Sequence, residues 1–220
     1  AHIALIIRHG ADWFRAIGTA TDPGSSLITI SGAIDRPGVY EIAHGTALDA
    51  LLQVAGGTER LRAVLVGGYF GSWLAASEID GARLSSEHLS QYGAALGAGV
   101  IVALGDRGCA VAECSRIADY FADESSGQCG PCVNGLGAIA DTVQRLATGT
   151  ADGAARQRLE RWTTELPGRG ACAHPDGAAR FIASALRVFS DEFHDHARRG
   201  RCERCGHAPV LPVPMLVPHE

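Results

Sequence analysis

The pattern of hydrophobic and polar positions divides the chain into two regions with different periodicity. Residues 27–105 contain short β-branched runs between glycine and proline turns, which predict strands. From Cys114 onward, apolar residues recur every three or four positions, which predicts amphipathic helices. The sequence therefore predicts an α+β protein in which a mixed module precedes an all-helical one.

The first region predicts four strands and one helix. The strands are expected at residues 27–32, 39–42, 64–66 and 100–104, and the helix at residues 47–55. A turn at Asp35–Gly38 joins the first two strands, Thr46 can cap the helix, and Gly56 and Gly57 end it. Because a β-grasp module needs this order of strands around one helix, we expect that fold here.

The second region predicts four helices. They are expected to begin at Cys114 and to continue at about residues 136–148, 152–165 and 177–199, the last with Asp176 as its cap. The last helix has one apolar stripe, formed by Phe181, Ile182, Ala185, Leu186, Phe189 and Phe193. Residues 1–18 predict one amphipathic helix or, because of Gly10, two short ones. The proline-rich end of the chain is expected to be extended or disordered.

Charge and hydropathy exclude two classes of protein. The net charge of −5 and the pI near 6.0 argue against a nucleic-acid-binding protein, whose binding surface is basic. The longest apolar runs, Ile3–Ile7 and Val100–Leu104, are far shorter than the ~18 residues of a membrane span. No signal peptide is recognised. We therefore expect a cytoplasmic protein without a membrane span.

The cysteines indicate metal or redox chemistry. An odd number in a chain without an export signal disfavours a disulfide framework. The seven residues are Cys109, Cys114, Cys129, Cys132, Cys172, Cys202 and Cys205. Two of the pairs, Cys129/Cys132 and Cys202/Cys205, have the C-x-x-C spacing that suits a metal ion or a redox site.

The cysteine loop, residues 124–132, carries the strongest chemical signal. Gly127 and Gly130 allow backbone amides to turn toward a bound thiolate or sulfide, and its two cysteines can bind one metal ion or two corners of a cluster. Cys172 follows Cys132 by about forty residues, and a helical hairpin between them would return it to the same place. The alternative is that all three are reduced, partly buried thiols.

The second pair, Cys202/Cys205, has two interpretations. It can be half of a zinc site that needs two further ligands, or a lone flexible pair. Since no second close pair lies nearby, we prefer the lone pair, and we interpret Cys109 and Cys114 as core thiols. A zinc-stabilised interaction protein that uses both C-x-x-C pairs is a further hypothesis.

The cysteine loop, with the sequence ESSGQCGPC, resembles the E-S-C-G-x-C-x-P-C signature of a known family. This family is the NADH-binding flavoprotein subunit of respiratory complex I and related diaphorase-type subunits. Residues 8–14 are similar to its linker helix, residues 27–40 to its soluble-ligand-binding β-grasp (SLBB) domain, and residues 184–193 to its final helix.

The resemblance implies the following organisation. A linker helix would occupy residues 1–26, an SLBB-like β-grasp domain residues 27–108, a four-helix iron–sulfur domain residues 109–200, and a proline-rich tail residues 201–220. The helical domain would bind a [4Fe-4S] cluster that takes electrons from a flavin.

Three cysteines match the family's cluster ligands. These are Cys129, Cys132 and Cys172, while the fourth ligand position is occupied by Ser126. Serine oxygen is a harder ligand than thiolate, so a [3Fe-4S] cluster is an alternative to the four-iron form. His174 is an alternative fourth ligand, since imidazole replaces thiolate in some clusters.

The family binds FMN and NADH through a G-R-G-G-x-G-F loop, and this sequence has no match to that loop. The stretch Gly67–Gly71 is only superficially similar, because it follows a strand instead of opening a helix. We therefore expect FMN and NADH to bind another domain or subunit.

The expected function is electron transfer within a complex-I-like NADH dehydrogenase that is peripheral to a membrane complex. The electrons would pass from a flavin-binding partner to a ferredoxin-like acceptor. The alternative is a binding or scaffold module that has lost the cluster.

Overall fold

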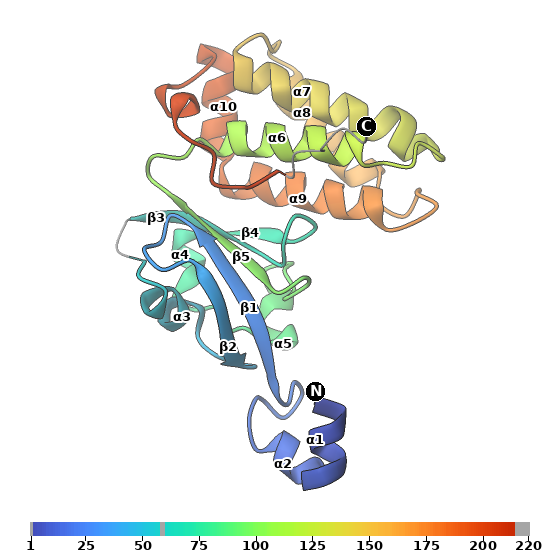
Figure 1. Ribbon diagram of the computed structural model, residues 1–220. Coiled ribbons are helices and arrows are strands. Elements are labelled where there is room, and N and C mark those ends of the chain that lie inside the picture. Colours follow the sequence, from blue (N-terminus) through green and yellow to red (C-terminus); the bar gives the residue numbers. More distant parts are fainter. Residues whose placement is uncertain (1, 58–59, 214–220) are drawn as a thin grey trace, which may run out of the picture. The chain divides into compact units, whose positions relative to one another are not determined.

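The computed structural model describes residues 2–57 and 60–213, which form two compact units that divide between Asp106 and Arg107 (Figure 1). The first unit combines strands and helices, and the second is helical. The prediction of an α+β protein is therefore confirmed. Within the described part of the chain, no helix has both the length and the apolar character needed to cross a membrane.

The first unit is built on a five-stranded mixed sheet. Its strands are β1 (Ser25–Gly32), β2 (Gly38–Ala43), β3 (Leu61–Val66), β4 (Ser72–Ala75) and β5 (Val100–Gly105), in the spatial order β2-β1-β5-β3-β4. The β1–β5 pair is parallel and the other pairs are antiparallel. Its helices are α1 (His2–His9), α2 (Ala11–Arg15), α3 (Leu48–Val54), α4 (Ala76–Ile79) and α5 (Ser86–Ser90).

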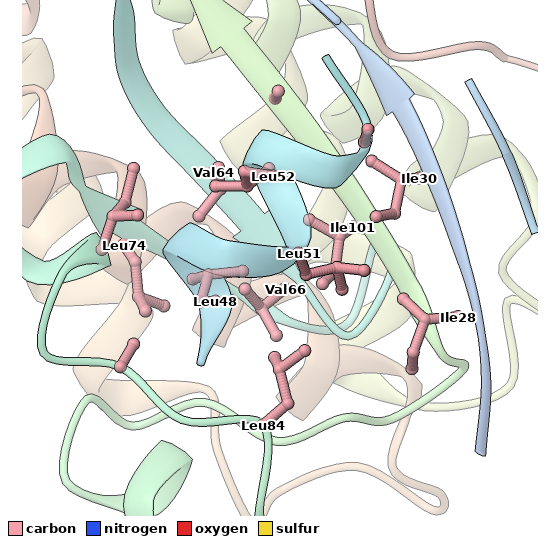
Figure 2. Close-up of a cluster of buried hydrophobic side chains, with 14 of the residues drawn as sticks. Ile28, Ile30, Leu48, Leu51, Leu52, Val64, Val66, Leu74, Leu84 and Ile101 are labelled. Carbon is pink, nitrogen blue, oxygen red and sulfur yellow. The ribbon is translucent and has the colours of Figure 1, made fainter. Parts of the chain in front are cut away.

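Helix α3 lies across one face of this sheet (Figure 2). Its apolar residues Leu48, Leu51 and Leu52 are buried among side chains from the strands. The strand residues of this cluster include Ile28, Ile30, Val64, Val66, Leu74 and Ile101. Alternation along β1 places Ile28 and Ile30 on the covered face, while the preceding Leu27 is exposed.

Strand β4 was not predicted, because it follows the glycine-rich turn at residues 67–71 and is only four residues long. Gly67 and Gly68 have positive φ angles of 97° and 78°, which glycine adopts without strain. The turn reverses the chain so that β4 pairs with β3, and it leaves Trp73 fully buried.

The second unit contains five α-helices within the described residues. They are α6 (Ala110–Asp123), α7 (Gly137–Thr148), α8 (Ala155–Glu165), α9 (His174–Val188) and α10 (Ser190–Arg199). A π-helical turn, η1 (Pro131–Leu136), leads directly into α7, and a short 3-10 helix, η2 (Glu203–Gly206), follows α10. Helix α6 packs on α7 and α9, α8 packs on α7 and α9, and α10 contacts all four (Figure 1).

The predicted helix at residues 177–199 is two helices in the structure. Helix α9 begins at His174, and the chain bends at Phe189, whose φ and ψ angles of −110° and 31° are not helical. The apolar stripe is nevertheless buried as predicted, because the bend turns Phe193 into the same core. Asp176 is not the cap, since it lies inside the first turn, where its carboxylate accepts a hydrogen bond from the Gly168 amide at 3.0 Å.

The segment after α10 folds back onto α6 without forming a helix or strand at residues 207–213. The buried carboxylate of Glu113 accepts hydrogen bonds from the backbone amides of Val210 and Leu211, at 2.9 and 3.0 Å. Arg116 forms an ion pair with Glu113 and donates to the Leu211 carbonyl. Leu211 is fully buried. Residues 214–220 of the predicted tail lie outside the described residues.

Gly10 separates α1 from α2, so the alternative of two short helices is the observed one. Their apolar residues are largely exposed, among them Ile3, Ile7 and Trp13. Periodicity predicted these helices, but the structure buries none of the residues of α1 or α2.

The packing of α3 gives a test of the first unit. Leu48→Ala should lower the free energy of unfolding by about 2–5 kcal/mol, because it removes a fully buried side chain from the cluster. Val54→Ala, on the exposed side of the same helix, should change it by about 0.5 kcal/mol or less. Urea unfolding followed by tryptophan fluorescence would measure both. Equal effects would show that α3 does not bury Leu48.

Candidate metal centre

The cysteine loop connects the end of α6 to the π-helical turn η1. Gly127 adopts a positive φ angle of 61°, which lets the chain reverse before Cys129. Cys132 is the second residue of η1 and is buried. Since π-helical turns are rare and are frequent at functional sites, this local geometry agrees with a binding role for the loop.

The structure brings Cys172 to the cysteine loop. Cys172 lies in the connection between α8 and α9, two residues before α9 begins. The backbone amide of its neighbour Ala171 donates a hydrogen bond to the sulfur of Cys129, and the Cys172 thiol lies close enough to Cys132 to affect its ionisation. Cys172 therefore lies near the cysteine loop, and the binding of one cluster by Cys129, Cys132 and Cys172 stays a prediction.

The surroundings of Cys129 and Cys132 shift the pKa values of these two thiols in opposite directions. Backbone amides of Ala171 and Cys132 donate to the Cys129 sulfur and lower the pKa of Cys129. Burial raises the pKa of Cys132, and the nearby Cys129 and Cys172 thiols raise it further. The Ser125 hydroxyl opposes this by donating a hydrogen bond to Cys132. The site thus offers one readily ionised, accessible thiol beside a buried one whose ionisation a cation would favour.

The two candidates for a fourth ligand have different positions. The Ser126 side chain is exposed in the loop, and its carbonyl accepts a hydrogen bond from Gln128. His174 is the first residue of α9, and its Nε2 lies 2.8 Å from the carbonyl oxygen of Phe121. A carbonyl oxygen only accepts, so Nε2 carries the proton, and His174 could bind metal only through Nδ1.

For the Cys202/Cys205 pair, the sequence analysis preferred a lone flexible pair to half of a zinc site and did not identify its neighbours. Cys202 and Cys205 are not a lone flexible pair, because their sulfur atoms lie beside Cys109 Sγ and His196 Nε2. These four residues are called the cysteine–histidine group below. All four ligand atoms lie within 4.8 Å of one another. Cys109 is a buried thiol as expected, but it belongs to this group, whereas Cys114 lies in the core of the unit.

One feature of the sequence could have indicated part of this group. His196 precedes Cys202 by six residues, with the helix-ending Gly200 between them, which suits a histidine and a C-x-x-C pair that share a metal. Cys109 carried no such signal, because it lies 87 residues before His196 in the sequence.

Comparison with known proteins identifies a family model and relatives that this chain resembles. Residues 112–196 match the family described as NADH-ubiquinone oxidoreductase-F iron-sulfur binding region. An F-type subunit of the NADH-quinone oxidoreductase of Rhizobium meliloti is 32% identical over 206 residues, covering 92% of this chain and 49% of the relative. The F-type subunit of the same enzyme in Mycobacterium bovis is 32% identical over 205 residues, covering 92% and 46%.

A solved structure shares the fold. The crystal structure of an NAD+-reducing [NiFe]-hydrogenase in the air-oxidized state matches with a TM-score of 0.81 and 28% identity, covering 90% of this chain and 34% of that chain. The chain spans about half the length of the curated relatives it matches. Over 92% of its length the chain is similar to F-type subunits of NADH-quinone oxidoreductase, and residues 112–196 match the iron-sulfur binding region of that subunit.

Proposed function

We propose that Cys129, Cys132 and Cys172 bind three corners of a [4Fe-4S] cluster and that this cluster passes electrons within a complex-I-like NADH dehydrogenase. The observation that carries the proposal is the return of Cys172 to the cysteine loop, supported by the hydrogen bond from Ala171 to Cys129. When bound, the cluster accepts and releases single electrons. The chain's own residues supply the thiolates and the backbone amides that stabilise their negative charge.

The dipoles of two helices favour an anionic group at this place. Cys132 lies at the start of η1, which continues into α7, and Cys172 lies just before α9. The amino-terminal end of a helix carries a partial positive charge, so both ends stabilise thiolates and a bound anionic cluster. Helix α9 contacts η1, which keeps these ends together.

The fourth ligand position distinguishes this chain from the family signature. A serine at residue 126 would bind iron through a hard alkoxide oxygen, whose proton is costly to remove. We propose that this corner is the labile one and that a [3Fe-4S] form arises there on oxidation. His174 is the second candidate, although its Nε2 is already bonded to Phe121. The presence of serine also favours the competing function, a scaffold of the same fold without a cluster.

The first unit fits a β-grasp module of the SLBB type. Its central β1–β5 pair is parallel, its outer pairs are antiparallel, and α3 covers one face. We propose that the second unit is the family's four-helix iron–sulfur domain. In the whole assembly, a flavin-binding domain or subunit would bind FMN and NADH and deliver the electrons, and a ferredoxin-like protein would accept them.

The ligand set is tested by iron content. The chain purified without oxygen should contain about four iron atoms with matching acid-labile sulfide, and Cys172→Ala should lose most of both because one corner of the cluster has no ligand. Cys114→Ala, which removes a core thiol outside the loop, should retain them. Full iron content in Cys172→Ala would show that the ligand set is wrong. A wild-type chain without iron would favour the scaffold.

The identity of the fourth ligand is tested by Ser126→Cys. This variant should resist bleaching by air several-fold longer than the wild-type chain and should have a higher reduction potential, because thiolate replaces a harder oxygen ligand. Paramagnetic resonance and visible absorption would measure both changes. Ser86→Cys, which places an exposed thiol outside the cysteine loop, is the control. Identical behaviour of Ser126→Cys and the wild-type chain would point to His174 instead.

A further inference from the structure

The cysteine–histidine group joins the beginning of the second unit to its end. Cys109 is the residue that caps α6, His196 lies in the last turn of α10, Cys202 directly precedes η2, and Cys205 lies within it. Cys205 Sγ lies 3.7 Å from Cys202 Sγ and 3.4 Å from Cys109 Sγ. His196 Nε2 lies 3.5 Å from Cys109 Sγ and 4.0 Å from Cys205 Sγ.

These separations are those of ligands around one tetrahedral ion. With Zn–S bonds near 2.3 Å and Zn–N bonds near 2.0 Å, the edges of the tetrahedron are about 3.7 Å between sulfurs and about 3.5 Å between sulfur and nitrogen. A disulfide would require its sulfurs to be about 2.05 Å apart. The four ligand atoms therefore converge as a metal site does, with no bond between the sulfurs.

The hydrogen bond of His196 prepares its ring for a metal. Nδ1 lies 2.9 Å from the carbonyl oxygen of Leu146, which can only accept a hydrogen bond. Nδ1 therefore carries the proton of the neutral ring, and Nε2 presents its lone pair to the sulfurs of Cys109 and Cys205. A hydrogen bond of this kind from the outer nitrogen fixes the tautomer and orientation of metal-binding histidines. His196 is 2% exposed, so its ring is held in place.

Hydrogen-bond donors around the site stabilise its sulfur atoms. The Ala112 amide donates to Cys109 Sγ at 3.4 Å. Arg204 lies between the paired cysteines, donates a hydrogen bond to Cys202 and forms an ion pair with the buried Glu192 at 3.3 Å. Glu192 also accepts a hydrogen bond from the Ala110 amide at 3.0 Å. These contacts orient the ligands from outside, as expected around a structural metal.

The site also has an entry path. A cavity of about 500 Å³ is lined by residues that include Cys109, Cys205 and Arg116. Cys109 is buried, while Cys202 and Cys205 are half-buried. An ion can therefore reach the thiols of Cys109 and Cys205 from this cavity.

We propose that Cys109, His196, Cys202 and Cys205 bind one zinc ion in a closed structural site. Zinc is favoured because three thiolates and one imidazole in a tetrahedron leave no open position, which is the arrangement of structural zinc sites. Ligands of an iron–sulfur cluster bind different iron atoms and stand further apart than ligands of a single ion. The proposal is independent of the cluster at the cysteine loop, because the two sites share no ligand.

Metal analysis of the full chain tests the proposal. The chain, produced without a histidine tag, should contain about one zinc ion in addition to any iron. His196→Ala and Cys205→Ala should each lose nearly all of the zinc. Cys114→Ala, which removes a buried thiol of the same helix α6, should keep it. Cys172→Ala should lose iron and keep zinc, so failure of the cluster proposal and failure of this one are distinguishable.

A measurement on the wild-type chain guards against variants that fail to fold. Zinc-edge X-ray absorption should show three sulfur ligands and one nitrogen ligand, and Co²⁺ in place of zinc should give the intense bands of tetrahedral thiolate coordination. Full zinc in both His196→Ala and Cys205→Ala would overturn the proposal. A wild-type chain without zinc, an iron centre in its place, or a Cys202–Cys205 disulfide in freshly isolated protein would also overturn it.

Discussion

The packing of α6 against its neighbouring helices is the interaction on which both thiol groups depend. Cys109 caps the start of α6, and the cysteine loop leaves its end. The 14 residues between these points span about 20 Å of helix, so the two groups belong to opposite ends of one rigid element. Phe121, near the second end, packs edge-to-face on Phe181 of α9 and so ties α6 to the helix that Cys172 precedes.

Buried polar contacts define the path of the chain after α10. A carboxylate buried without partners would destabilise the fold, yet Glu113 is only 4% exposed. It is compensated by Arg116 and by two backbone amides of the returning segment. Glu192 has the same function in the first turn of α10, where it pairs with Arg204 and Ala110. Two acidic side chains thus fasten the segment after α10 to the helices.

The sequence predicted elements whose cause is local. The β-branched runs of β1 and β5, the turn before β2 and the stripe of α9 all follow from neighbouring residues, and the structure has them. The loop signature likewise located Cys129 and Cys132. Strand β4 and the bend at Phe189 were missed, since each depends on packing that no local pattern encodes.

The cysteine–histidine group is a clearer example of a feature that local sequence patterns do not predict. Two of its members have a recognisable spacing, but that pair alone is an incomplete metal site, because it has no partner pair nearby in the sequence. Cys109 precedes Cys205 by 96 residues, and it joins the group because α6 packs on α10. Only the tertiary structure contains that information.

The position of Cys109 has a consequence for the synthesis of the chain. A ribosome that makes this protein releases Cys109 before any other residue of the cysteine–histidine group, and Cys205 follows only after 96 more residues. The contacts of Cys109 with His196 and Cys205 can therefore form only after helices α6 to α9 have been synthesised.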